Sequence, residues 1–284
     1  IAAAVADWAL PRVDVKAAVL VGSQMRSETP ADRWSDLDVI LLVDDPEPYA
    51  RDESWVAEFG RPVLTFLEPT AVSDQQERRV LYEDGEDVDL PLIPVAALER
   101  IDRSEDVPWL LARGYRVLVD KIDLAGRLRE VAATARRPEP PTQHDLTELA
   151  SDFWFHALWT ARKLRRGEVL TAHGCLDGLL LSKLVTLLSW HARAVDPSVD
   201  TWHGTRFVER WADPGVLAAL ESAFPRYDVR DVARALWATI DLWQGLEEET
   251  ARRLGLVVEL DHADLRRRIA EVVPHPRGRS TLGP

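Results

Sequence analysis

The sequence predicts an α+β protein in two parts, a mixed β-sheet with helices followed by an all-α helical bundle. In the first half, short apolar runs bounded by turn residues alternate with helical stretches. A proline-rich segment, "ARRPEPPTQHD" (135–145), follows, and beyond it strand signals almost vanish. The 284 residues are enough for two domains, which we place at 1–137 and 143–273.

The first part contains several apolar runs with the length and flanking residues of strands. "RRVLYEDGEDVDLPLIPV" is typical of a hairpin, with Asp84-Gly85 at the turn and a returning strand at 88–93. The other expected strands are "AAVLVGS" (17–23), "DVILLVDD" (38–45) and "PVLTFLEP" (62–69). Helices are expected near the N-terminus and at 94–102 and 123–135. Adjacent strands of this kind need not be parallel, so the sheet is predicted to be mixed.

Helical spacing dominates the second part. A first helix is expected from an Asp145–Glu148 cap pattern to Gly167, followed by one long, nearly all-round apolar helix over 168–195. Further helices are predicted at 213–224, where Asp213 is the cap and Pro214 the first helical residue, and at 229–255 and 261–273. The tail 274–284 is expected to be disordered.

Composition narrows the classes of protein. A net charge of −13 argues against general nucleic-acid binding and favours either cationic partners or simple solubility. The single Cys175 excludes an internal disulfide framework and a zinc ribbon, and the seven histidines lack metal-ligand spacing. Without a run of about eighteen apolar residues or a signal-peptide pattern, we expect a soluble, cytoplasmic monomer that does not bind a membrane.

Three aspartates carry the chemistry that the residues themselves suggest. Asp36 and Asp38 open an apolar strand and point to the same face, so they can share one metal ion or flank two. Asp89 interrupts another apolar strand, "VDLPLI", which is expected to lie in the same sheet. Such a carboxylate cluster suits Mg²⁺ bound together with substrate phosphates. Taken singly, each aspartate could instead be a solvated strand end or the partner of a buried arginine.

A turn that binds phosphate is predicted just before the aspartates. Gly22 and Ser23 end the first strand, where glycine lets the backbone approach an oxyanion and successive N–H groups can form an anion-binding nest. Arg26 could reach the same phosphates. A lone Gly-Ser is nearly always an ordinary turn, so the prediction depends on the combination with Asp36, Asp38 and Asp89.

The combination of Gly22-Ser23, Arg26, Ser35-Asp36-Leu37-Asp38 and Asp89 resembles the signature of the nucleotidyltransferase superfamily, which includes DNA polymerase β. The segments "FGRPVLTFLEP", "DVDLPLIPV", "DFWFHALWTARKLRRGEVL" and "LLSKLVTLLSWHAR" resemble, more narrowly, the aminoglycoside 6-adenylyltransferases, which modify streptomycin. The resemblance runs from about residue 17 to about residue 255. One position departs from the family pattern, because Gln24 stands where an arginine usually follows Gly-Ser.

The resemblance implies an N-terminal nucleotidyltransferase domain, a helical substrate-binding domain and an active site in the cleft between them. It also implies that ATP and Mg²⁺ are required, that AMP passes to a drug hydroxyl, most plausibly the 6-position of streptomycin, and that resistance results. Asp36, Asp38 and Asp89 would be the metal-binding and catalytic residues. Asp89 or a nearby acid such as Glu86 would take the hydroxyl proton, and that assignment stays open.

Candidate residues in the second part have ordinary interpretations beside the functional ones. Arg162 and Lys163 are candidates for triphosphate binding, although cations near a helix C-terminus also stabilise the helix. Asp152 and Asp177 could face a cationic drug or lie on solvated helix faces. Trp154 is a candidate substrate residue, although core packing is the commoner use of such a residue.

Two rival functions remain at this point. The first keeps the chemistry and changes the acceptor to another aminoglycoside, a lincosamide or a protein side chain. The second is a non-catalytic nucleotidyltransferase domain that acts as a nucleotide sensor or antitoxin. Because Asp36, Asp38 and Asp89 are all present, we favour the enzyme.

Overall fold

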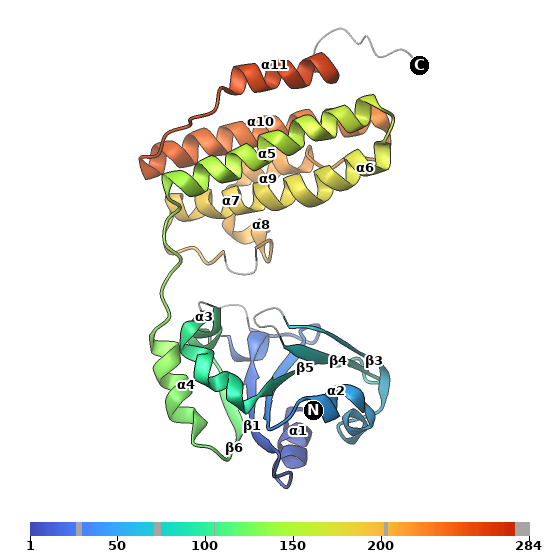
Figure 1. Ribbon diagram of the computed structural model, residues 1–284, viewed down its shortest axis with the longest axis vertical. Coiled ribbons are helices and arrows are strands. Elements are labelled where there is room, and N and C mark those ends of the chain that lie inside the picture. Colours follow the sequence, from blue (N-terminus) through green and yellow to red (C-terminus); the bar gives the residue numbers. More distant parts are fainter. Residues whose placement is uncertain (27–29, 71–74, 105, 202–203, 276–284) are drawn as a thin grey trace. The chain divides into compact units, whose positions relative to one another are not determined.

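The computed structural model describes residues 1–26, 30–70, 75–104, 106–201 and 204–275 (Figure 1). The chain divides into two compact units, Ile1–Pro138 and Glu139–Pro284, and each is described by itself. From residue 276 onward, the predicted disordered tail lies outside the described residues.

The first unit is built on a mixed sheet, as predicted. The described residues form six strands in the order β3-β4-β5-β2-β1-β6. The pairing of β2 with β5 is parallel, and the other neighbours are antiparallel. The strands are β1 (Val15–Val21), β2 (Leu37–Val43), β3 (Pro62–Pro69), β4 (Gln76–Tyr82), β5 (Asp87–Pro94) and β6 (Arg116–Asp120). The short edge strand β6 was not anticipated, because its few apolar residues have no period of their own and depend on pairing with β1.

Helices cover both faces of this sheet. On one face, α1 (Ala2–Ala9), α2 (Glu47–Arg51) and the 3₁₀ segment η2 (Ser54–Glu58) supply an aromatic cluster, in which Trp8 stacks on Trp55 at 5.1 Å between ring centroids. On the other face, α3 (Asp106–Ala112) and α4 (Leu124–Ala133) pack against β1 and β2. The helix expected at 94–102 is a 3₁₀ segment, η3 (Val95–Arg103). Both faces are therefore apolar and buried over the centre of the sheet.

In its described residues, the second unit is helical throughout. Its helices are α5 (Gln143–Arg165), α6 (Val169–Gly174), α7 (Leu181–Val195), α8 (Val208–Trp211), α9 (Pro214–Glu221), α10 (Val229–Leu254) and α11 (His262–Val272). Phe153 of α5 stacks on Trp243 of α10 at 3.9 Å between ring centroids, at the centre of the core. The N-cap of α5 is Thr142, with Asp145 completing a capping box, so the Asp145–Glu148 cap was placed three residues too late.

The helix predicted as continuous over 168–195 contains a π-helical segment, η4 (Cys175–Leu180), between α6 and α7. The stretch Val169–Val195 is long and apolar enough to cross a membrane by length and composition alone. One face of it, including Leu176, Leu180 and Leu184, packs into the core of the unit. Of its most apolar 18 consecutive residues, 28% are buried, so only one face of the stretch belongs to the core.

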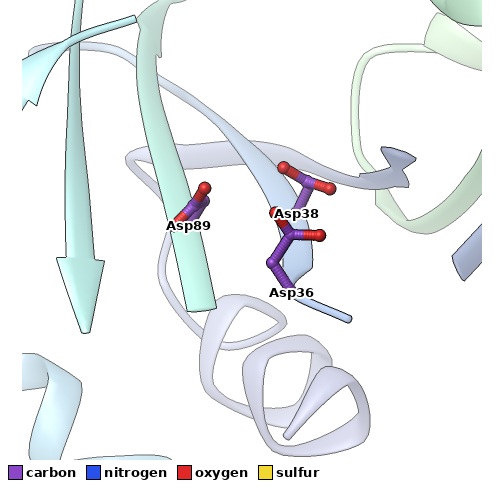
Figure 2. Close-up of side chains that lie close together, drawn as sticks. All are labelled: Asp36, Asp38 and Asp89. Atoms are coloured by element: carbon purple, nitrogen blue, oxygen red, sulfur yellow. The ribbon is translucent and has the colours of Figure 1, made fainter. Parts of the chain in front are cut away.

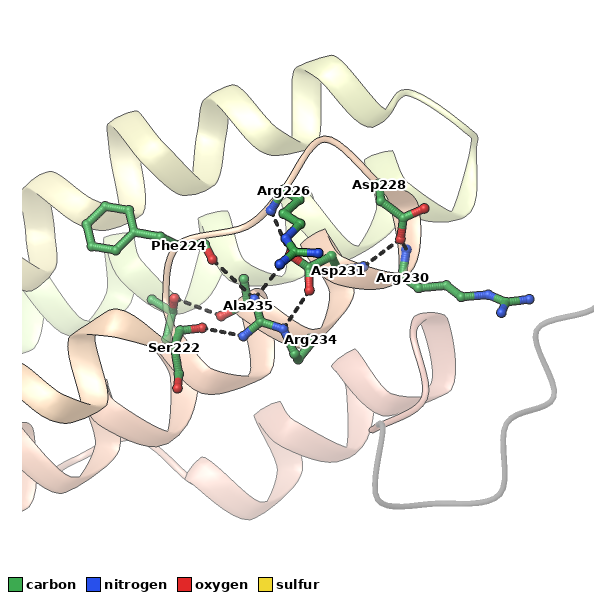
Figure 3. Close-up of polar contacts among 9 residues, drawn as sticks. Ser222, Phe224, Arg226, Asp228, Arg230, Asp231, Arg234 and Ala235 are labelled. Atoms are coloured by element: carbon green, nitrogen blue, oxygen red, sulfur yellow. Dashed lines mark hydrogen bonds and ion pairs between the residues drawn. The ribbon is translucent and has the colours of Figure 1, made fainter.

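A polar network fixes the connection between α9 and α10 (Figure 3). Arg234 donates hydrogen bonds to the carbonyl oxygens of Ser222 (2.7 Å) and Phe224 (3.1 Å) and pairs with Asp231 at 2.7 Å. The hydrogen bonds from Arg234 and from the backbone N–H of Arg226 lower the pKa of Asp231 to about 2. A single guanidinium therefore holds the loop against the first turn of α10.

Candidate active site

Three aspartates from neighbouring strands meet in the first unit. Asp36 lies directly before β2, Asp38 lies on β2, and Asp89 lies on β5, where the parallel register pairs it with Asp38. Each offers one carboxylate oxygen, and these oxygens lie within 4.8 Å of one another (Figure 2). Asp89 is buried, whereas Asp36 and Asp38 are half-buried. The three residues predicted to form one site are thus brought together by strand pairing.

The carboxylates share a strongly negative environment. Burial raises the pKa of Asp38 to about 7, and the charges of Asp36 and Asp89 add to that effect. Burial also raises the pKa of Asp89 to about 6, against the opposing charge of Arg79. A fourth acid, Glu77 of β4, has its pKa raised to about 7 by burial and by the charge of Asp89. A cation bound among these groups would relieve both the desolvation and the mutual repulsion.

Gly22 makes room for the Asp38 carboxylate. It follows β1 directly and has a φ of +72°, a backbone conformation that favours glycine. A Cβ atom at this position would lie 1.8 Å from Oδ2 of Asp38. Gly22 therefore permits a close approach by a carboxylate of the site itself, and phosphate binding at this turn stays a prediction.

Ser23 and Gln24 attach this turn to the loop that carries Asp36. Ser23 is buried, and its Oγ donates to the backbone oxygen of Asp36 at 3.2 Å and lies 3.4 Å from Oδ1 of Asp36. The side chain of Gln24 donates to the same backbone oxygen at 3.4 Å. Arg26 is half-buried, and its charge acts on Asp38. The three residues thus border the site, and Gln24 supports its geometry at the position of the expected arginine.

Arg79, Glu68 and Glu77 are residues of this site that the sequence analysis missed. Arg79 of β4 faces Asp89 in the antiparallel register, with its Nε 2.8 Å from Oδ1 of Asp89. Its Nη1 lies 2.8 Å from Oε1 of Glu68 on β3. The predicted two-residue turn at Asp84-Gly85 would pair residue 79 with residue 90, but the loop in the structure is residues 83–85, which shifts the register so that Arg79 faces Asp89.

The alternative proton acceptor named from the sequence, Glu86, lies in the turn between β4 and β5 with an exposed side chain. Glu77, two residues from Arg79 on the same face of β4, is the acid whose charge acts on both Asp38 and Asp89. The nearby acid with the stronger structural case is therefore Glu77.

In the second unit, the two candidate aspartates are both paired. Asp152 of α5 contacts Nζ of Lys183 at 2.5 Å and Nδ1 of His156 at 2.7 Å. Partial burial acts to raise the pKa of Asp152, but the hydrogen bond and charge of Lys183 outweigh it and keep that pKa below its ordinary value. Asp177 lies in the π-helical segment, 3.1 Å from Nδ1 of His173. Each carboxylate therefore already has a cationic or polar neighbour.

Trp154 requires a correction. Its side chain is only 1% exposed and packs between Phe153 and His262 in the core of the second unit. A ring without accessible surface cannot contact a substrate, so the packing interpretation replaces the binding one.

Arg162 and Lys163 lie in the last turn of α5. Lys163 pairs with Glu168 at 2.8 Å and lies over the ring of Trp159, at 5.0 Å from its centroid. Arg162 is exposed. The contacts of Lys163 are those of a cation that stabilises a helix end, while Arg162 presents its guanidinium to solvent.

The chain is similar to several known proteins. Residues 1–270 match the family model described as streptomycin adenylyltransferase. Aminoglycoside 6-adenylyltransferases from Bacillus subtilis and Staphylococcus aureus are each 25% identical over 193 residues, which cover 65% and 66% of this chain. A third, from Campylobacter jejuni, is 25% identical over 181 residues and 62% of the chain.

These alignments span 65%, 66% and 60% of the relatives' own lengths. A crystal structure of an aminoglycoside 6-adenyltransferase from Bacillus subtilis superposes with a TM-score of 0.47 at 17% identity, over 95% of this chain and 96% of that one. The family model covers nearly the whole sequence, and the chain therefore belongs to the streptomycin adenylyltransferase family.

Proposed function

We propose that this protein transfers AMP from ATP to a hydroxyl group of an aminoglycoside, with the 6-position of streptomycin as the leading acceptor and antibiotic resistance as the outcome. Family membership and the names of the three relatives support adenylyl transfer to an aminoglycoside. The observation that carries the proposal is the convergence of Asp36, Asp38 and Asp89 beside the Gly22 turn.

The donor atoms fit Mg²⁺. Three carboxylates within 4.8 Å of one another offer the hard oxygen ligands that Mg²⁺ prefers, and two of them have pKa values raised by crowding and burial. Asp36, Asp38 and Asp89 would hold the ion. When bound, Mg²⁺ would neutralise phosphate charge and acidify the acceptor hydroxyl.

The chain's own residues then have distinct tasks. The backbone N–H groups of the turn at Gly22 and Ser23 would receive triphosphate oxygens, together with the guanidinium of Arg26. Asp89 or Glu77 would accept the proton of the acceptor hydroxyl, because both acids lie at the carboxylate cluster where that hydroxyl would be held.

Residues 1–137 would form the catalytic domain and 143–273 the domain that binds the acceptor. In the latter, Asp152 and Asp177 are the candidates for the cationic drug, and Arg162 and Lys163 for the triphosphate. Asp152 would exchange its contact with Lys183 for a guanidinium of the drug, since guanidinium pairs bidentately with carboxylates. The cytoplasmic location and the monomeric state remain predictions.

The test is a transfer assay with purified protein, ATP and Mg²⁺ against a panel of aminoglycosides and lincosamides, with product masses measured. We expect addition of one AMP unit to streptomycin and loss of that product in Asp38→Asn. Asp7→Asn, which alters an exposed acid on α1, is the control for the loss of one carboxylate. If another acceptor is modified instead, streptomycin is not the substrate. If a folded protein modifies no acceptor at all, the enzymatic function is refuted.

A further inference from the structure

Arg79 lies within a row of charged side chains that crosses four adjacent strands. The row runs from Glu68 on β3 through Arg79 on β4 and Asp89 on β5 to Asp38 on β2. Arg79 is paired with Asp89, and Asp89 with Asp38, in the strand registers. The positive charge thus stands beside the carboxylate triad at a position set by the backbone.

The guanidinium uses different nitrogens for its two acidic neighbours. Nε contacts Oδ1 of Asp89 at 2.8 Å, and Nη1 contacts Oε1 of Glu68 at 2.8 Å. Asp87 lies farther away, at 4.0 Å from Nη2. A planar group held at two edges has little rotational freedom, so it fixes the orientation of the Asp89 carboxylate. Oδ1 of Asp89 is thus in ion-pair contact with Arg79.

The charge of Arg79 is permanent. The hydrogen bond to Glu68, followed by the charges of Asp89 and Asp87, raises the pKa of Arg79 above its ordinary value despite partial burial. Four acids gather negative charge beside this cation: Asp36, Asp38, Asp89 and Glu77. A fixed cation here reduces the repulsion among these acids when no metal ion is bound. The same charge repels a divalent ion and therefore lowers the affinity of the carboxylates for it.

We propose that Arg79 is a positioning residue for the reaction, a fixed counter-cation that holds Asp89 in its working orientation and weakens metal binding in doing so. The inference rests on the proposed function. It makes two predictions. Removing the positive charge should strengthen divalent-ion binding, whereas removing the planar guanidinium that contacts both Asp89 and Glu68 should slow catalysis. A salt bridge that only joined β3, β4 and β5 would leave kcat of the folded variant unchanged.

The experiment compares Arg79→Gln and Arg79→Lys with wild type at pH 8.5, where the carboxylates of the site are ionised. Arg61→Gln is the matched control, since Arg61, just before β3, pairs with Glu83, just after β4, at 3.1 Å but is exposed and outside the site. The readouts are Mn²⁺ affinity by electron paramagnetic resonance without nucleotide, and kcat and KM for ATP in the Mg²⁺ assay.

We expect Arg79→Gln to bind Mn²⁺ about tenfold more tightly while kcat falls at least about tenfold and KM for ATP changes less than about twofold. Arg79→Lys keeps the positive charge, so its Mn²⁺ affinity should be close to that of wild type. Its kcat should stay as low as that of Arg79→Gln, because an ammonium group cannot contact Asp89 and Glu68 with the fixed geometry of a guanidinium. Should Arg79→Gln fail to fold, Arg79→Lys and Glu68→Gln carry the test, and Glu68→Gln must then lower kcat with a smaller change in Mn²⁺ affinity.

Mn²⁺ affinity that is unchanged or weaker in Arg79→Gln, or kcat equal to that of Arg61→Gln, overturns the inference. A wild-type protein that neither binds Mn²⁺ nor transfers AMP refutes the proposed function instead. The two failures are therefore distinguishable.

Discussion

Replacing Gly22 with alanine isolates the contact between the first turn and the metal-binding carboxylates. The added Cβ would lie 1.8 Å from Oδ2 of Asp38, whereas an ordinary contact begins near 3.4 Å. The backbone of Asp38 is fixed, because β2 pairs there with Val21 of β1 and Asp89 of β5. The Asp38 carboxylate therefore has to move by about 1.5 Å.

Two costs follow, and they fall on different properties. Alanine at a φ of +72° destabilises the fold by about 1 to 2 kcal/mol. A carboxylate displaced by more than 1 Å should lower kcat/KM by about 100-fold or more, which corresponds to about 2.7 kcal/mol of transition-state stabilisation. Gly85→Ala is the matched control, because Gly85 has a φ of +89° in the hairpin turn but an added Cβ would meet nothing within 4 Å.

The assay measures the melting temperature and kcat/KM of both variants. We expect similar losses of thermal stability in the two proteins and loss of transfer activity in Gly22→Ala alone. If Gly22→Ala retained kcat/KM within about threefold of Gly85→Ala, the close approach would not control the position of Asp38, and the reasoning would fail.

The remaining predictions concern charge. Folded Asp38→Asn should lose measurable AMP transfer, and near-normal turnover would remove the metal hypothesis. In the folded state the pKa of Asp38 is raised to about 7 and that of Asp89 to about 6. The folded protein therefore keeps protons that the unfolded chain releases near pH 4. Without divalent ions, thermal stability should fall as the pH rises towards 7. Added Mg²⁺ should restore that stability at pH 8 in wild type but not in Asp38→Asn. The hydrogen bond to buried Glu247, 3.1 Å away, raises the pKa of His262, so His262→Gln should destabilise the protein by about 2 kcal/mol at pH 6 and by less as the pH rises through that pKa; equal losses at pH 6 and pH 9 would contradict this. Finally, Asp152→Asn and added salt should each raise KM for the drug more than KM for ATP, and indifference to both would exclude Asp152 from acceptor binding.

The sequence by itself determined the elements whose signals are local. Alternating apolar residues and the Asp84-Gly85 turn specified the β4–β5 hairpin, but not its register, because the loop of residues 83–85 pairs residue 79 with residue 89 and a two-residue turn would pair it with residue 90. The spacing of Asp36 and Asp38 placed two carboxylates on one face, and prolines and caps delimited the helices of the second unit.

Only the tertiary structure decided how distant segments meet. The parallel pairing of β2 with β5 joins residues about fifty positions apart, and no local pattern selects that neighbour from the other strands. Burial of Trp154 and the pairing of Asp152 with Lys183 depend on helix packing, which a one-dimensional period does not specify. The carboxylate site also depends on tertiary structure. Its aspartates could be named from the sequence, but its geometry exists because the strand order places Asp38, Asp89 and Arg79 side by side.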